Sequence, residues 1–228
     1  RSSRGEIRRE RRLLAVADVD HIGLDDRVAG QFCLCHWFTR RIARISRRLP
    51  AMSRSVGVES MKSDEEIRLA QERVMSVFHR RPEAALDTKH ADASISEGLT
   101  CTVTEGDREV VLDMPEPVGG SELGPSPGFH ARAAIAGCVA IGIKMTAIRL
   151  GIELRSVKVG VDMDFDDSAI FGMGEASAAP LKTHLKITVA SDADRETLQG
   201  LVDTALEADP YFLALRDPQK VETSLEFE

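Results

Sequence analysis

A single cysteine near the middle of a long apolar stretch is the first candidate for chemistry in this chain. Cys138 lies in the run GFHARAAIAGCVAIGIKMTAIRLG, residues 128–151. A cysteine reacts as its thiolate, and apolar surroundings favour the protonated, inert thiol. His130 precedes Cys138 by eight residues, about 12 Å along a helix, which is too far for a base that would take its proton. On this spacing alone, an inert buried cysteine is favoured over a reactive one.

The rest of the chain offers no better-formed catalytic or metal-binding pattern. The paired acids Asp166 and Asp167 are interpreted as loop charges, and no Ser-His-Asp arrangement is signalled. The segment Cys33-Leu34-Cys35-His36 contains the residue types of zinc ligands, but no second pair follows it to complete four ligands. No strand-helix-strand unit carries a GxGxxG or P-loop sequence. The sequence therefore predicts neither a metal nor another cofactor.

The stretch around the cysteine has the start and stop signals of one long helix. Ser126 can cap it, Pro127 suits its first turn, and Gly151 lies where a left-handed residue ends a helix. No charged residue occurs between Arg132 and Lys144, so we expect a helix that is buried on all sides. That uncharged run is shorter than the roughly 20 residues that cross a bilayer, which predicts a soluble domain without a membrane span. Close packing against another helix is predicted by its small residues: Ala133, Ala134, Ala136, Gly137, Ala140 and Gly142.

Charge divides the chain into two parts. The 228 residues carry a net charge of −7, but residues 1–60 hold 13 arginines against 7 acidic residues, and the remainder holds 17 basic and 30 acidic residues. An acidic body of this kind is not typical of a nucleic-acid binder. The four cysteines are too few for a disulfide scaffold, so we expect a cytoplasmic protein.

The basic segment 1–60 needs an explanation of its own. Residues 38–50, FTRRIARISRRLP, could form a short helix that lies on an anionic membrane surface or directs the chain to an organelle. The alternative is a poorly ordered N-terminal extension ahead of a natural start at Met61. The abrupt change in composition at Met61-Lys62 favours the extension and predicts a domain boundary between residues 60 and 61.

From residue 61 onward, apolar periodicity predicts a mixture of helices and strands. Ser63 and Glu66 form a capping box ahead of a first helix. Ser191 is predicted to cap a later amphipathic helix, which Asp209-Pro210 ends. Strands are predicted in five segments: residues 99–104, 108–114, 157–165, 181–189 and 220–227. This order indicates the α+β class with a largely antiparallel sheet.

Four motifs carry a resemblance to a known family. They are Asp113-Met114-Pro115, Gly119-Gly120, Gly124-Pro125-Ser126-Pro127, and an AAIAGC run that ends with Cys138 eleven residues after Pro127. Over residues 63–228 the chain resembles the OsmC family of osmotically inducible and organic-hydroperoxide-resistance proteins. The resemblance implies an OsmC-like domain at 61–228 that forms an intertwined homodimer, with the sheet wrapped around two central helices and the active site at the interface. It also implies a pocket loop that contains Gly119, Gly120, Pro125, Ser126, Pro127 and Gly128.

The better-known members of that family are thiol peroxidases, which implies a role for Cys138. Its thiolate would attack a hydroperoxide and become a sulfenic acid. In those members a second cysteine, in a Cys-Pro step after the second helix, closes a disulfide, and an arginine and a glutamate hold the thiolate. This sequence has Asp209-Pro210 at that step and Gly128 at the glutamate position. The arginine has three upstream candidates, Arg80, Arg81 and Arg108.

Two hypotheses from different classes therefore remain open. The first is a peroxidase that reduces organic hydroperoxides through Cys138 and uses an external thiol in place of the missing cysteine. The second is a non-catalytic protein of the same fold that binds a small apolar or thiol-bearing ligand at the dimer interface. Burial and the Asp209 carboxylate would both disfavour the thiolate, so an arginine that reaches the Cys138 sulfur would separate the two hypotheses.

Overall fold

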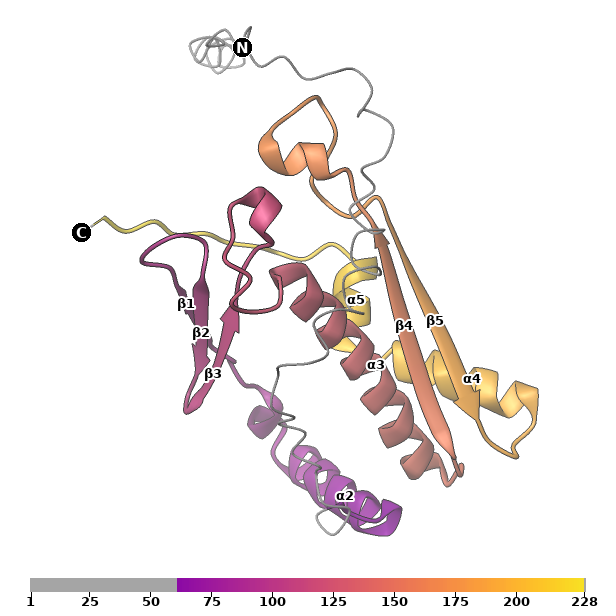
Figure 1. Ribbon diagram of the computed structural model, residues 1–228. Helices are drawn as coiled ribbons and strands as arrows, with labels where there is room; N and C mark the ends of the chain where they lie inside the picture. The colour runs from indigo at the N-terminus through magenta and orange to yellow at the C-terminus, as the bar shows by residue number, and fades with distance from the viewer. Residues whose placement is uncertain (1–60, 228) are drawn as a thin grey trace, which may run out of the picture. The chain divides into compact units, whose positions relative to one another are not determined.

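The computed structural model describes residues 61–227 (Figure 1), and the predicted basic extension 1–60 lies outside the described residues. Short 3-10 helices are labelled η. The elements are α2 (Asp64–Arg80), η3 (Pro82–Ala85), β1 (Asp92–Ser94), β2 (Cys101–Glu105), β3 (Arg108–Leu112), η4 (Glu116–Val118), α3 (Pro127–Leu150), β4 (Ser156–Asp164), η5 (Asp167–Phe171), β5 (Lys182–Ala190), α4 (Arg195–Leu206) and α5 (Pro210–Arg216). Helices combined with antiparallel sheets confirm the predicted α+β class.

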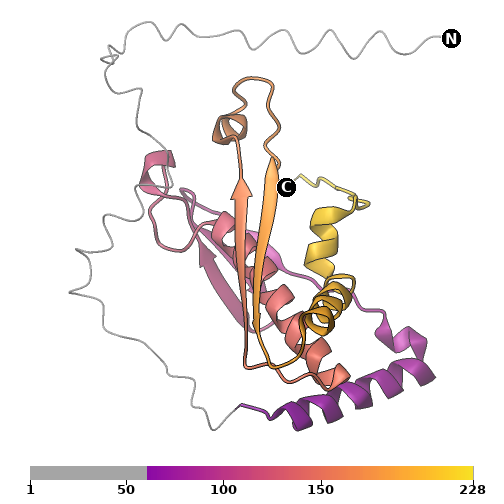
Figure 2. The ribbon, with the colours of Figure 1, turned by 90° about the vertical axis from the view of Figure 1, so that its right-hand side faces the viewer.

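The described strands form two separate antiparallel sheets. In the first, β2 lies between β1 and β3, and Val103 pairs with both Ala93 and Val110. In the second, β4 and β5 form a long two-stranded hairpin that runs from the Ser156–Ala190 pair to the Asp164–Lys182 pair (Figures 1 and 2). Each of these sheets is small for an independent domain, because a two-stranded hairpin is stable in water only when it packs on something else.

The predicted strands fit this arrangement with two exceptions. β2, β3, β4 and β5 each lie within one or two residues of a predicted segment. β1 was missed because Asp92-Ala93-Ser94 has no apolar alternation, and only its pairing with β2 makes it a strand. The strand predicted at 220–227 is wrong, because these residues pair with no strand in the described part of the chain. Alternating residue types favour a strand, but a strand also requires a neighbouring strand to which its backbone can hydrogen-bond.

The core lies where α3 packs on α4 and on the β4–β5 hairpin. Val139, Ile143 and Ala147 of α3 are buried against Leu201 and Ala205 of α4. The inward apolar residues of the hairpin, which alternate with exposed ones as predicted, cover the same cluster: Val157, Val159, Ile187 and Val189. Full burial of one large aliphatic side chain contributes about 1.5–3 kcal/mol. The middle of α3 is therefore the best-anchored part of the domain.

The α3 helix begins and ends as the sequence predicts. The Ser126 Oγ accepts a hydrogen bond from the Phe129 N–H at 3.3 Å, and Gly151 ends the helix with a positive φ of 68°. The prediction that α3 is buried on all sides is wrong for the described chain, however. Ile141 is 62% exposed and Met145 is 39% exposed. With Ala131 and Ala134, these residues recur at helical spacing and form a single exposed apolar face, which we call the open stripe.

By length and composition alone, α3 could cross a membrane. Pro127–Leu150 is long and apolar enough for this, and 33% of its most apolar stretch is buried inside the protein. The core helix of a soluble protein satisfies the same criterion. In the described chain, α3 packs on α2, β4, α4 and α5, which is the arrangement of a core helix.

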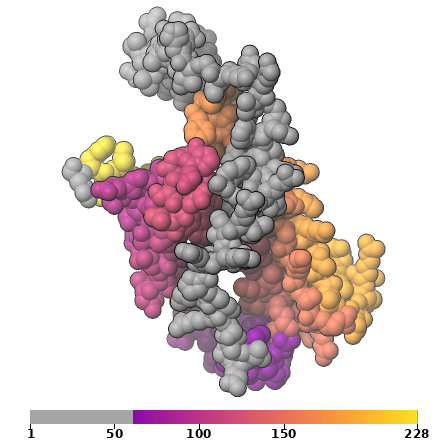
Figure 3. Space-filling view, in the orientation of Figure 1, coloured from indigo at the N-terminus to yellow at the C-terminus, as the bar shows by residue number. Residues whose placement is uncertain are grey.

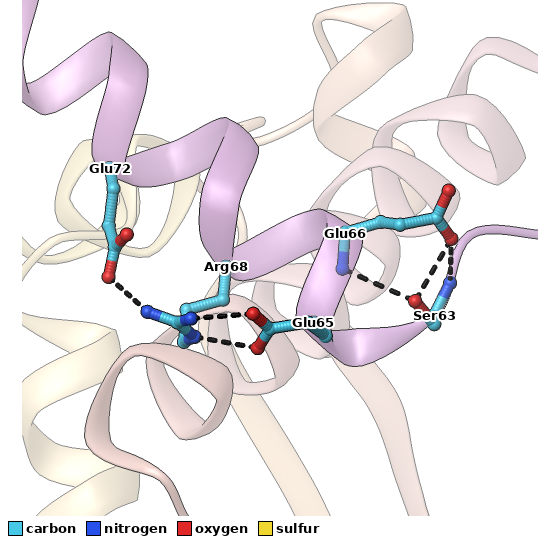
Figure 4. A network of polar contacts seen from close by, with 5 residues as sticks. All are labelled: Ser63, Glu65, Glu66, Arg68 and Glu72. Carbon is cyan, nitrogen blue, oxygen red and sulfur yellow. Dashed lines mark hydrogen bonds and ion pairs between the residues drawn. The ribbon is translucent and has the colours of Figure 1, made fainter.

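The α2 helix is held by polar contacts at both its start and its surface. The predicted capping box is present, since the Glu66 N–H donates to Ser63 Oγ at 3.2 Å and the Ser63 N–H donates to Glu66 Oε2 at 2.8 Å (Figure 4). Arg68 pairs with Glu65 and Glu72 on the same helix (Figure 4). No residue of α2 is fully buried. The helix is therefore attached to α3 through contacts that remain partly exposed to solvent.

The α4 helix starts at a different cap from the predicted one. Asp194, not Ser191, is the N-cap, because its Oδ1 accepts the Thr197 N–H at 2.9 Å. The Ser191 hydroxyl instead donates to the Glu153 carbonyl at 2.6 Å. The sequence holds two acceptable capping residues three positions apart, and the contact with Glu153, 38 residues away, decides between them.

Candidate functional site

Cys138 lies in the middle of α3, at the border between the buried core and the open stripe. Its thiol is free and half-buried. The next residue, Val139, is part of the core cluster, whereas Ile141 on the other side is exposed. The sulfur is thus held on a well-anchored helix and remains close to the surface. This is an arrangement in which a thiol can meet a small molecule.

Asp209 is the polar side chain next to this thiol. It is 3% exposed and is the N-cap of α5. Its Oδ1 accepts the N–H groups of Tyr211 at 3.0 Å and Phe212 at 2.8 Å. Its Oδ2 is buried and has no hydrogen-bond partner among the described residues. One carboxylate therefore starts a helix with one oxygen and leaves the other oxygen unpaired.

The surroundings of Cys138 raise the pKa of its thiol above the ordinary range. Burial is the largest cause, and the Asp209 carboxylate is the next, through both its proximity as an acceptor and its negative charge. The Tyr211 backbone N–H acts in the opposite direction and lowers the pKa. The carboxylate is close enough to shift the pKa of the thiol, although the thiol and Oδ2 do not meet ordinary hydrogen-bond geometry. Burial and Asp209 thus act in the direction expected from the sequence, against the thiolate.

None of the three arginines named from the sequence is among the groups that shift the pKa of this thiol. The groups that shift the pKa of Cys138 include no arginine. Arg80 bonds the Ser76 carbonyl on its own helix at 3.1 Å, Arg81 ends that helix, and Arg108 lies in β3. Within residues 61–227, the groups that shift the pKa of the thiol are thus a carboxylate and a backbone N–H, and none of them is a cation.

Sequence reasoning missed a different arginine, Arg132. Its Nη1 lies 3.3 Å from the place that a Cβ on Gly128 would occupy. The guanidinium thus lies beside Gly128 at the start of α3. The spacing of four residues on one helix could have revealed this neighbour. Cys138 lies six residues further along the helix, about 9 Å away along its axis, so Arg132 belongs to the start of α3 and not to the thiol.

The predicted pocket loop is a tight connection between β3 and α3. A Cβ on Gly120 would lie 1.8 Å from the Met114 carbonyl oxygen, and one on Gly124 would lie 2.2 Å from that of Val111. Gly119 ends η4 with a positive φ of 90°. Only glycine fits at these positions. From Pro125 to Gly128, the same segment closes the loop and begins α3, because the Pro125 carbonyl accepts the Asp113 N–H at 3.3 Å and Ser126 and Pro127 form the helix start.

A buried carboxylate that the sequence did not single out for this role holds that loop together. Asp113 is 1% exposed. Its two oxygens accept the N–H groups of Met114 (2.7 Å), Leu123 (3.2 Å) and Ser121 (3.3 Å) and the hydroxyl of Thr100 (3.0 Å). Burial acts to raise the pKa of Asp113, but these four donors together hold it below its ordinary value. The surface of the loop, from η4 onward, is visible in magenta in Figure 3.

The surface hollow described for residues 61–227 does not lie at Cys138. A surface hollow of about 450 Å³ exists, but it lies at the far end of α3 beside Gly151, Arg155 and Asp192. Neither the pocket loop nor the thiol lines it. No group of three or more His, Cys, Asp or Glu side chains able to hold a metal ion occurs among residues 61–227.

Comparison with known proteins confirms the family resemblance over part of the chain. The family described as OsmC-like protein matches residues 119–224, which include the loop, Cys138 and Asp209. No curated protein matches the chain.

Solved structures of OsmC and organic hydroperoxide resistance proteins are among those similar to the chain. An OsmC-like protein from Mycoplasma pneumoniae is 14% identical, with a TM-score of 0.49, over 57% of this chain and 88% of that one. An organic hydroperoxide resistance protein from Legionella pneumophila is 24% identical, with a TM-score of 0.41, over 57% and 90% of the two chains. The organic hydroperoxide resistance protein OhrB of Bacillus subtilis is 24% identical, with a TM-score of 0.40, over 57% and 91%.

Proposed function

We propose that residues 61–228 form an OsmC-like thiol peroxidase domain that reduces organic hydroperoxides through Cys138 alone. The observation that carries this proposal is the position of Cys138: a free, half-buried thiol on the anchored helix of a segment that matches the OsmC-like family. The domain works in the cytoplasm, where small thiols are available as reductants. Residues 1–60 are an extension outside the catalytic domain.

The reaction is written with Cys138 as the only protein thiol. Its sulfur attacks one peroxide oxygen, the S–O bond forms, the O–O bond breaks, and the thiol proton leaves with the second oxygen as an alcohol. One external thiol then displaces water from the sulfenic acid and forms a mixed disulfide with Cys138. A second external thiol releases Cys138 and leaves as the oxidised disulfide. Asp209 cannot replace the missing cysteine in these steps, since a carboxylate forms no disulfide.

The raised pKa of Cys138 makes activation the limiting requirement. Within one chain, burial and Asp209 favour the unreactive thiol. We infer that a second copy of the chain covers the open stripe and supplies a cation. The exposed apolar side chains of Ile141 and Met145 on α3, and of Val221 and Leu225 in the unpaired segment 220–227, support a homodimer. An obligate dimer of this kind buries more than about 2,000 Å².

The test uses a chain in which Cys138 is the only cysteine, made by changing Cys33, Cys35 and Cys101 to serine. We expect this variant to consume cumene hydroperoxide in the presence of dithiothreitol and to form a dimedone adduct on Cys138. The matched control adds Cys138→Ser to the same background and is expected to be inactive. Peroxide consumption that survives Cys138→Ser would contradict the proposal.

The second candidate is a protein that binds a small apolar or thiol-bearing ligand at the dimer interface without catalysis. The raised pKa of the Cys138 thiol is the observation that favours it. If Cys138 resists dimedone under excess hydroperoxide while the dimer binds an apolar fluorescent probe beside α3, this second function is the correct one.

A further inference from the structure

We propose that Asp209 accepts a hydrogen bond from the sulfenic acid of Cys138 through Oδ2 and so stops the oxidation of this cysteine at one added oxygen. The inference rests on the proposed peroxidase function and assigns a positioning and protecting role to the residue that stands where related peroxidases carry their second cysteine.

The first argument is the unpaired oxygen itself. Asp209 is 3% exposed, and its Oδ2 is buried without a partner among the described residues. A buried acceptor without a donor is unfavourable, and such a group in a folded protein needs an explanation. A hydrogen-bond donor that exists only when Cys138 is oxidised explains the unpaired oxygen.

The second argument is the fixed orientation of the carboxylate. The N–H groups of Tyr211 and Phe212 both bond Oδ1, which holds the side chain at the start of α5 and leaves Oδ2 on the other side. Oδ2 lies 3.5 Å from the place that a Cβ on Gly142 would occupy. It therefore faces α3, one turn beyond Cys138. Since residue 142 has no side chain, nothing at that position separates Oδ2 from the helix.

The third argument is the change in donor when the sulfur is oxidised. A thiol is a weak hydrogen-bond donor, and in the reduced state the thiol and Oδ2 do not reach ordinary hydrogen-bond geometry. Reaction with one hydroperoxide replaces S–H with S–O–H and releases an alcohol. The hydroxyl is a stronger donor and extends one bond further from the sulfur. Oxidation thus supplies the donor that Oδ2 lacks.

Protection follows from the charge of the carboxylate. A second oxidation, from sulfenic to sulfinic acid, proceeds when the sulfenate anion attacks another hydroperoxide and the second alcohol leaves. A neighbouring negative charge disfavours formation of that anion, and a hydrogen bond to Oδ2 favours the neutral acid further. An incoming external thiol can still attack the sulfur of the neutral acid, so turnover continues while irreversible oxidation slows. In a chain without a second cysteine at this position, such protection replaces the disulfide.

The test measures the two oxidation steps separately in the full-length chain that retains Cys138 as its only cysteine. Mass spectrometry counts the oxygen atoms added to Cys138 during exposure to cumene hydroperoxide, and the rate of the second addition is divided by the rate of the first. Two variants change Oδ2. Asp209→Asn removes the charge and Asp209→Ser removes the second oxygen, and both residues can still cap a helix. Asp203→Asn, an exposed aspartate on α4 that accepts only a Gln199 bond, is the matched control.

The proposal predicts that the ratio rises severalfold in Asp209→Asn and in Asp209→Ser and is unchanged in Asp203→Asn. Thermal melts confirm that each variant is folded. If wild-type Cys138 gains one oxygen and the two Asp209 variants gain the second no faster than wild type, this inference is overturned while the peroxidase function stands. If wild-type Cys138 gains no oxygen at all, the proposed function fails and the inference fails with it.

Discussion

The Cys138 thiol and the Asp209 carboxylate are neighbours, and after burial this carboxylate is the main reason that the pKa of the thiol is raised. The pair joins the middle of α3 to the first residues of α5. Most reactive thiols have a cation as a neighbour. A carboxylate in that place means that the reactivity of Cys138 depends on what else reaches the sulfur.

The first prediction concerns the alkylation of Cys138 as a function of pH. Because the pKa of the thiol is raised, we expect slow reaction with iodoacetamide at neutral pH and a midpoint above that of a free cysteine. Asp209→Asn removes the charge and should move the midpoint to lower pH. The measurement is the rate of alkylation of the single-cysteine chain followed by mass. An unchanged midpoint in Asp209→Asn would show that burial alone sets the pKa.

The second prediction concerns Asp113 and the loop before α3. Asp113→Asn keeps the size of the side chain but loses a charged acceptor for three backbone N–H groups and the Thr100 hydroxyl, so the melting temperature at neutral pH should fall by several degrees. Asp107→Asn, in the exposed turn between β2 and β3, is the control and should change little.

The effect of Asp113 should also depend on pH. Its pKa in the folded state is below the ordinary value, so its contribution to stability is present at neutral pH and is lost as the pH falls through the folded-state pKa. The difference in melting temperature between wild type and Asp113→Asn should therefore shrink in acid. A difference that stays constant with pH would mean that the charge plays no part.

The third prediction concerns assembly. Ile141→Arg places a charge in the open stripe and should convert a dimer to a monomer in sedimentation velocity runs. Leu181→Arg is a closely matched control, since both residues are 62% exposed and apolar, but Leu181 lies beside the β4–β5 hairpin and not on α3. If both variants sediment as wild type, the open stripe is not the interface.

The fourth prediction concerns the start of α3. Ser126→Ala removes the acceptor for the Phe129 N–H and should cost about 1 kcal/mol of unfolding free energy. Denaturant titration measures the loss, and Ser121→Ala in the preceding loop is the control, because Ser121 contributes its backbone N–H to Asp113 and not its hydroxyl. A loss that Ser121→Ala matches would mean that the cap is not the cause.

The fifth prediction concerns Asp209→Cys. If the related peroxidases place their second cysteine here, this variant should form an intramolecular disulfide with Cys138 after one equivalent of hydroperoxide, which thiol titration detects. It should also unfold more readily than wild type by about 0.5–2 kcal/mol, because cysteine is a poor replacement for an aspartate cap. Asp203→Cys on the exposed side of α4 should form no such bond.

The features that the sequence predicted correctly depend on contacts between residues that are close together in the chain. The capping box of Ser63 and Glu66 and the limits of α3 at Ser126 and Gly151 depend on contacts within a few positions, and all were predicted correctly. The order of elements and the α+β class follow from the same local patterns. The proximity of Asp209 to Cys138 was expected through the family resemblance, and in the structure the Asp209 carboxylate contributes to the raised pKa of the thiol.

What the sequence could not predict depends on distant partners. The burial of Asp113 requires Thr100 and Ser121, which lie 13 and 8 residues away. The choice of Asp194 over Ser191 depends on Glu153. The residues of the open stripe are as apolar as those of the core face, so composition could not show that one side of α3 lacks a covering element.

The two oxygens of Asp209 have different contacts, so the same side chain affects both the folding of α5 and the chemistry of Cys138. Oδ1 starts α5, and Oδ2 faces the thiol-bearing helix. A mutation that introduces a thiol at position 209 also removes the side chain that caps α5, and a mutation that weakens this cap also alters the surroundings of Cys138. Selection on either property therefore acts on both.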